Sequence, residues 1–176
     1  CSSVIATKTA LSLADWVVTE AGFGFDLGAE KFFDIKCASA GLDTAAVVLV
    51  ATVRALKRHG YVAKSRIAEP DPAAVERGLA NLAKHLESIR DFGEVPVIAL
   101  NRFVTDTDEE IAVVRRAAAA WGAPFAVCDA FARGGDGATA LAGEVLAHAE
   151  RKSQPFRPLY QREDPPKEKM VKIPRH

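Results

Sequence analysis

The stretch AVVLVATV (residues 46–53) is apolar at nearly every position, and VPVIAL (residues 95–100) repeats this character. Such runs are typical of parallel strands that helices cover on both faces. Two shorter runs rich in β-branched or aromatic residues, WVVT (residues 16–19) and FAVC (residues 125–128), predict two further strands. We therefore expect four strands in a mostly parallel sheet.

Helical sequence lies between these strands. Asp71-Pro72 is typical of a helix start, and Gly93 is typical of the end that follows. TDEE (residues 107–110) predicts a capping box, and residues 54–59 and 138–151 predict two further helices. On the helix at residues 54–59 we expect Lys57 and Arg58 on a solvated face, whereas Arg54 or His59 could face a site. Strands that alternate with helices predict an α/β fold with right-handed connections.

The composition excludes several classes of protein. The 176 residues, 49% of them hydrophobic, are enough for one compact core. Lys plus Arg and Asp plus Glu both number 23, so no net charge attracts nucleic acid or anionic lipid. No signal peptide and no apolar run of about 20 residues occurs. Cys1, Cys37 and Cys128 are too far apart for a metal or disulfide framework, which favours reduced thiols in a cytoplasmic protein without a metal site.

The chain divides near residue 152. Residues 1–152 are expected to form an α/β domain. Residues 153–176 are rich in Pro and charge and predict an extended C-terminal tail. Because the sequence starts with Cys1 and enters helical sequence at once, we interpret it as an internal fragment of a longer protein.

Two loops that follow predicted strands carry glycine. The first, TEAGFG (residues 19–24), combines Thr19 and Glu20 with Gly22 and Gly24, which would let the backbone approach a ligand closely. The second is RGGDG (residues 133–137), where Gly134 and Gly135 precede a helix. In both loops the glycines could equally serve only to turn the chain. Neither is a P-loop, since GxxxxGK[ST] is absent from the sequence.

A third candidate follows the strand at residues 95–100. Asn101 offers an amide donor and acceptor to the edge of a purine, and Phe103 offers a ring to its face. Asp106 lies too far along for a guanine-specific pattern. The alternative is that Asn101 forms a turn and Phe103 belongs to the core.

These segments together resemble the formate–tetrahydrofolate ligase family. The similarity is in order and covers roughly residues 1–172. It is carried by SVIATKTA (3–10), TEAGFG (19–24), DLGAEKFFDIKC (26–37), VATVRALK (50–57), HG (59–60), NRF with TDT (101–107) and ARGGDG (132–137). Departures from the family pattern are Phe25, Ala38, Tyr61, Phe131 and Ala138.

The resemblance implies a partial P-loop NTPase-like core, a mostly parallel sheet flanked by helices. It implies that residues 1–152 are part of a nucleotide-binding α/β domain and that the tail at residues 153–176 leads to a further domain. It implies an enzyme that uses ATP with Mg²⁺, formate and tetrahydrofolate to make 10-formyltetrahydrofolate, as a homo-oligomer in its full-length form. The residues it implies at the adenine pocket are Asn101, Phe103, Phe131, Gly134 and Gly135. It places Thr19, Glu20, Gly22 and Gly24 in a loop near the active centre and identifies no catalytic residue.

Two alternatives stay open from the sequence. One is a truncated, catalytically inactive product that binds nucleotide weakly or docks to a partner chain. The other is an unrelated nucleotide-binding domain of flavodoxin-like topology. If the chain is a ligase fragment, we expect it to be inactive alone, because the phosphate-binding motif is missing from it.

Overall fold

The computed structural model describes residues 3–22 and 24–173, and the chain forms two compact units. We call residues 45–86 and 94–153 the sheet unit, and residues 1–44, 87–93 and 154–176 the aromatic unit. Helix α4 (Pro72–Asp91) contributes to both. Each unit is described by itself.

The sheet unit is built on three parallel strands. These are β1 (Val48–Ala51), β2 (Val97–Asn101) and β3 (Phe125–Cys128), in the order β1-β2-β3. Leu49 pairs with Ile98, and Ala99 pairs with Ala126. The prediction of an α/β fold with a parallel sheet flanked by helices is therefore confirmed.

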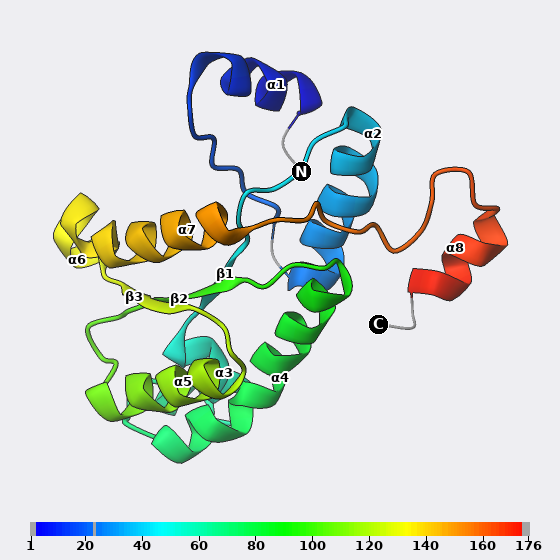
Figure 1. Cartoon of the computed structure of the whole chain (residues 1–176). Coiled ribbons are helices and arrows are strands. Elements are labelled where there is room, and N and C mark those ends of the chain that lie inside the picture. Colours follow the sequence, from blue (N-terminus) through cyan, green and yellow to red (C-terminus); the bar gives the residue numbers. More distant parts are fainter. Residues whose placement is uncertain (1–2, 23, 174–176) are drawn as a thin grey trace. The chain divides into compact units, whose positions relative to one another are not determined.

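Helices cover both faces of this sheet, as Figure 1 shows: α7 (Thr139–Arg151) lies on one face, and α3 (Val53–His59), α4 and α5 (Asp108–Ala120) lie on the other. The predicted caps are present. Thr52 and Asp71 accept hydrogen bonds from the first turns of α3 and α4, and Thr107 and Glu110 form the capping box of α5. Short helical turns η3 (Lys64–Arg66), α6 (Ala130–Arg133) and η4 (Gly134–Ala138) complete the unit.

The core of the sheet unit is aliphatic. It is formed by buried residues from the strands and from the inner faces of α3, α4 and α5, among them Val53, Leu56, Val75, Leu82, Ile98, Leu100, Ile111 and Val114. Helices α3 and α4 approach very closely, because a Cβ at Gly78 would lie 2.0 Å from the carbonyl oxygen of Leu56. Glycine at this position is therefore required by packing.

The strand predicted at residues 16–19 is wrong. This run is in the aromatic unit, is not part of a strand, and leaves Val18 97% exposed. β-branched residues favour strands only where a neighbouring strand pairs their backbone and buries their side chains. The sequence of a single run does not contain that information.

The aromatic unit is mostly helical. Its elements are α1 (Val4–Leu13), the π-helical segments η1 (Gly24–Ala29) and η2 (Lys31–Cys37), the short α2 (Ala38–Ala40) and α8 (Pro166–Lys172). Its core is a cluster of five rings, from Phe25, Phe32, Phe33, Phe92 and Phe156.

The C-terminal segment, predicted to be extended, contacts the aromatic unit and contains α8. Phe156 packs 5.1 Å from Phe33, measured between ring centroids. The backbone N–H of Arg157 donates to the carbonyl of Phe92, and that of Leu159 donates to Asp34 Oδ1. The segment thus has defined contacts with the other parts of the unit, although its described residues are half-buried or exposed.

Candidate functional site

The carboxyl ends of β2 and β3 lie side by side and bring two of the predicted site segments together. Asn101, the last residue of β2, is half-buried and pairs with Cys128 at the end of β3. The N–H of Arg102 donates to the carbonyl of Cys128 at 2.9 Å. The residues that follow each strand, including Phe103 and the glycine loop, therefore leave from the same edge of the sheet, where ligands of open α/β sheets bind.

Phe103 starts a tight turn that Asp106 closes. The Phe103 N–H donates to Asp106 Oδ2 at 2.8 Å, and the Asp106 N–H donates to the Phe103 carbonyl at 3.0 Å. Burial raises the pKa of Asp106 above its ordinary value, and the Phe103 hydrogen bond and the nearby Lys57 and Arg54 offset this only in part. Asp106 thus fixes the backbone of Phe103 by a hydrogen bond that runs three residues back along the chain.

The ring of Phe103 is stacked against a cation. The guanidinium carbon of Arg54 lies 4.2 Å from the ring centroid, and Nη2 lies 3.4 Å from Thr105 Oγ1. Arg54 comes from the first turn of α3, directly after β1. Arg54, which the sequence suggested could face a site, thus contacts Phe103, a pairing that the sequence did not indicate.

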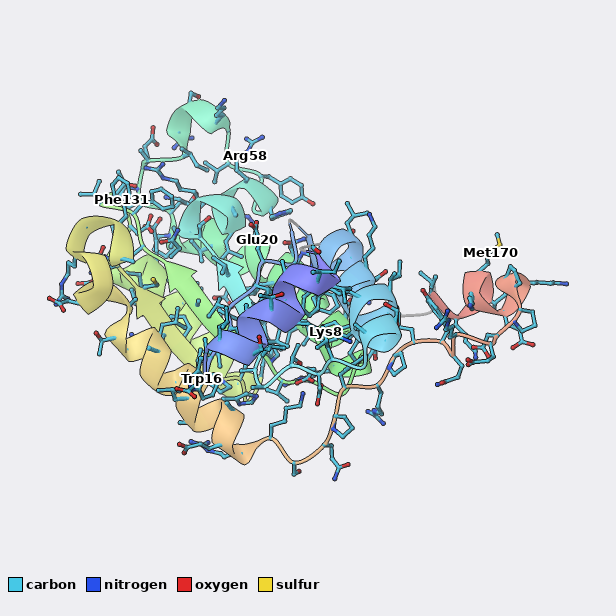
Figure 2. All side chains as sticks on the ribbon, turned by 90° about the horizontal axis from the view of Figure 1, so that it is seen from above. Lys8, Trp16, Glu20, Arg58, Phe131 and Met170 are labelled. Carbon is cyan, nitrogen blue, oxygen red and sulfur yellow. The ribbon has the colours of Figure 1, made fainter. Side chains whose placement is uncertain are left out.

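The glycine loop is closed at its base. The Asp129 N–H donates to the Gly137 carbonyl at 2.9 Å, and a Cβ at Gly137 would lie 2.3 Å from the Asp129 oxygen. Gly134 has a positive φ of 59°, whereas Gly135 has open space around its Cα. Phe131 projects from α6 and is 99% exposed (Figure 2). Phe131 thus offers an exposed aromatic ring on α6, the helix that follows the carboxyl end of β3.

A buried ion pair lies within the same unit. Lys57 Nζ is 2.8 Å from Glu110 Oε1, and both side chains are 0% exposed. Lys57 also donates to the carbonyl of Glu69, while the N–H groups of Asp71 and Thr107 donate to the Glu110 carboxylate. Burial raises the pKa of Glu110, but these hydrogen bonds and Lys57 outweigh it and hold the pKa below its ordinary value. The expectation that Lys57 is solvated is therefore wrong. The sequence around Lys57 could not indicate this, because its partner Glu110 is 53 residues away.

The other predicted loop belongs to the aromatic unit. Thr19 is half-buried and Glu20 is exposed; Gly22 and Gly24 have positive φ angles of 102° and 71°. These two glycines adopt a conformation that residues with a side chain rarely adopt. The predicted site residues therefore fall into two sets, one in each unit.

Within residues 3–22 and 24–173, no group of three or more His, Cys, Asp or Glu side chains is arranged to hold a metal ion. No helix in the same ranges has the length and apolar character to cross a membrane. Cys37 is buried and Cys128 is half-buried.

Comparison with known proteins identifies the family of this chain. The sequence model described as formate–tetrahydrofolate ligase matches residues 1–176. Proteins of that name from Sphingobium sp. and Cereibacter sphaeroides are each 54% identical to the chain, over 173 and 175 residues. One from Granulibacter bethesdensis is 52% identical over 165 residues.

These matches cover 98%, 99% and 94% of the chain but only 31%, 31% and 29% of the relatives. The chain thus spans about a third of the length of the curated relatives that it matches. An unrelated flavodoxin-like domain is excluded by the extent of the identity. The chain belongs to the formate–tetrahydrofolate ligase family.

Proposed function

We propose that this chain is the adenine-binding part of an enzyme that ligates formate to tetrahydrofolate at the expense of ATP. The products are 10-formyltetrahydrofolate, ADP and phosphate. The observation that carries the proposal is the shared sheet edge, where Asn101 ends β2 beside β3 and the loop that bears Phe131. Membership of the family supplies the reaction.

At this edge each residue has a distinct role toward a purine. The side-chain amide of Asn101 donates to and accepts from the edge of the base. Phe103, whose backbone Asp106 fixes, offers one ring, and the exposed Phe131 offers a second. Gly134 and Gly135 keep the loop beside them free of side chains. This set recognises the base and leaves the phosphates to other groups.

The triphosphate needs a separate grip. No P-loop motif occurs in the sequence. MgATP therefore binds with its base on this chain and its phosphates on residues outside it. In the proposed reaction a formate oxygen attacks the γ-phosphorus, ADP leaves, and N10 of tetrahydrofolate then displaces phosphate from the formyl carbon. Thr19, Glu20, Gly22 and Gly24 are proposed to lie near that chemistry.

The test is an Asn101→Ala substitution in the full-length ligase, with ATP affinity and product formation both measured. Loss of the base contact is expected to weaken ATP binding by about 1–3 kcal/mol, the usual cost of unmaking a buried polar contact. Asn81→Ala, on α4, is the matched control and is expected to leave affinity unchanged. Unchanged affinity in Asn101→Ala would make Asn101 a turn residue and remove the base site from this edge.

A second measurement tests the division of roles. The 176-residue chain alone is expected to form no 10-formyltetrahydrofolate from ATP, formate and tetrahydrofolate, because it lacks the phosphate-binding motif. Formate- and ATP-dependent product from the purified chain would contradict this proposal. An inactive full-length protein would instead support the alternative of a catalytically inactive product.

A further inference from the structure

We propose that Arg54 is a positioning residue for the base, which holds the ring of Phe103 in place by stacking on one of its faces. The base then stacks on the opposite face, so that guanidinium, ring and purine form three layers. The inference rests on the proposed function, since it assigns a second residue to the same adenine site. Arg54 itself touches Phe103 and not the nucleotide.

The contacts of Arg54 show that stacking determines its position. Its guanidinium carbon is 4.2 Å from the centroid of Phe103, a close cation–π distance. Its Nη2 makes a long hydrogen bond of 3.4 Å to Thr105 Oγ1. Its Nε is buried and has no hydrogen-bond partner within the described residues. A side chain placed to maximise its hydrogen bonds would not leave that donor unused. Asp106, whose Oδ1 is also buried without a partner in the described residues, attracts Arg54 by charge but makes no hydrogen bond to it. We therefore infer that the contact with the ring sets the orientation of the guanidinium.

The backbones of Arg54 and Phe103 are both held in place. Arg54 follows Val53, which is fully buried, and precedes Leu56, which is 3% exposed, in the capped first turns of α3. Phe103 is fixed through its backbone by Asp106. Because both backbones are held, the guanidinium restricts the remaining freedom of the ring, which is rotation about its side-chain bonds.

We take the face of the ring opposite Arg54 as the side that is open to the base. Phe103 is only half-buried, although Arg54 covers one face. A positive charge behind an aromatic ring draws its π-electron density away from the opposite face, which favours stacking of an electron-rich base such as adenine. Stacking with the base is also less costly in entropy when the ring is already ordered.

The experiment uses the full-length ligase and compares Arg54→Met, which keeps side-chain length but removes the planar cation, with Arg54→Lys. Dissociation constants are measured for ATP and for adenosine, which has no phosphate. Arg54→Met is expected to weaken both by a similar factor, about 3- to 10-fold from the usual strength of such stacks. Arg54→Lys, charged but not planar, should fall between wild type and Arg54→Met.

Arg58→Met is the matched control. Arg58 lies one turn further along α3, is exposed (Figure 2), and its Nη1 donates to the carbonyl of Val62. Its nucleotide affinities should equal those of the wild type. A loss in Arg54→Met for ATP but not for adenosine would show a phosphate contact and overturn the positioning role. An equal loss in Arg58→Met would show a general effect of helix charge, with the same consequence.

A readout without ligand completes the test. With 4-fluorophenylalanine in place of Phe103, the fluorine resonance of the free protein is expected to shift and broaden in Arg54→Met and to stay unchanged in Arg58→Met. An unchanged resonance in Arg54→Met overturns the proposal whatever the affinities. If the wild type makes product but does not bind adenosine, the base half of the proposal fails alone. If it neither makes product nor binds ATP, the proposed function fails, and the resonance still decides whether Arg54 orders the ring.

Discussion

The two units of this chain are stabilised in different ways. In the sheet unit, the backbones of the strands are paired and the core is aliphatic. Lys57 and Glu110 form a buried ion pair in the same unit. In the aromatic unit, five phenylalanine rings pack together from segments far apart in sequence, and none of its described residues lies in a strand. The strands of a sheet must pair in one register along their length, whereas the rings of a cluster need only be in contact. The base site that we propose lies in the sheet unit, where the paired strands fix the positions of the groups at their ends.

The largest expected effect comes from breaking the ion pair of the sheet unit. Lys57→Met leaves the Glu110 carboxylate buried without its cation, and we expect the free energy of unfolding to fall by about 3–5 kcal/mol. Chemical denaturation monitored by circular dichroism measures this.

The control for that change is an exposed pair in the same unit. Arg66 and Glu69 lie 2.8 Å apart with side chains 71% and 57% exposed, and Arg66→Met should cost no more than about 1 kcal/mol. If the two variants lost equal free energies of unfolding, burial would not distinguish the two ion pairs. The buried pair would then not be a special source of stability in the sheet unit.

The aromatic unit has its own most sensitive position. Phe33 is 2% exposed and contacts four other rings of the cluster, so Phe33→Ala is expected to cost about 3–4 kcal/mol. Hydrogen exchange should show faster exchange for amides of the aromatic unit, with the strands of the sheet unit still protected. Phe131→Ala, at a 99% exposed ring, should leave stability within about 0.5 kcal/mol. Uniform loss of protection in Phe33→Ala would show that the units unfold together.

The smallest effects concern pH within the sheet unit. Glu110 has a lowered pKa, so its contribution to stability is complete above the ordinary glutamate pKa and is lost as pH falls through the lowered value. Asp106 has a raised pKa, so it stabilises the fold at low pH and this contribution is lost as pH rises through the raised value.

Thermal unfolding between about pH 3 and pH 7 can separate the two groups. Asp106→Asn should lessen the loss of stability on the rising side, since an amide keeps the acceptor for the Phe103 N–H without a buried charge. A pH profile identical to that of the wild type would show that Asp106 does not titrate differently in the folded and unfolded states.

The sequence predicted those features whose physical cause is local. The apolar runs that became β1 and β2, the N-terminal cap by Asp71 and the capping box at Thr107 and Glu110 are each determined within a few residues. The predicted placement of Asn101 at the end of a strand follows from the same patterns. Which residues lie beside Asn101 at the end of the neighbouring strand follows from the parallel topology alone.

The features that were missed depend on distant residues. Lys57 is buried because it forms an ion pair with Glu110, and no sequence pattern around Lys57 indicates that partner. The run at residues 16–19 has strand-forming residues but no strand to pair with. Arg54 was a candidate without a role until the structure placed it on Phe103. Contacts of this kind cannot be predicted from one sequence, because spacing along the chain does not report them.

The order β1-β2-β3 also has a consequence for how the sheet assembles. The loop that joins the paired residues Ile98 and Phe125 is shorter than the one that joins Val48 and Val97. Closing a shorter loop costs less chain entropy, so the β2–β3 pair is expected to form before β1 joins it. Arg54 enters with β1 and α3, whereas Asn101 and the glycine loop are already together. During folding, the strand ends that carry Asn101 and the glycine loop would thus come together first. Arg54, which contacts the ring of Phe103, would join them last.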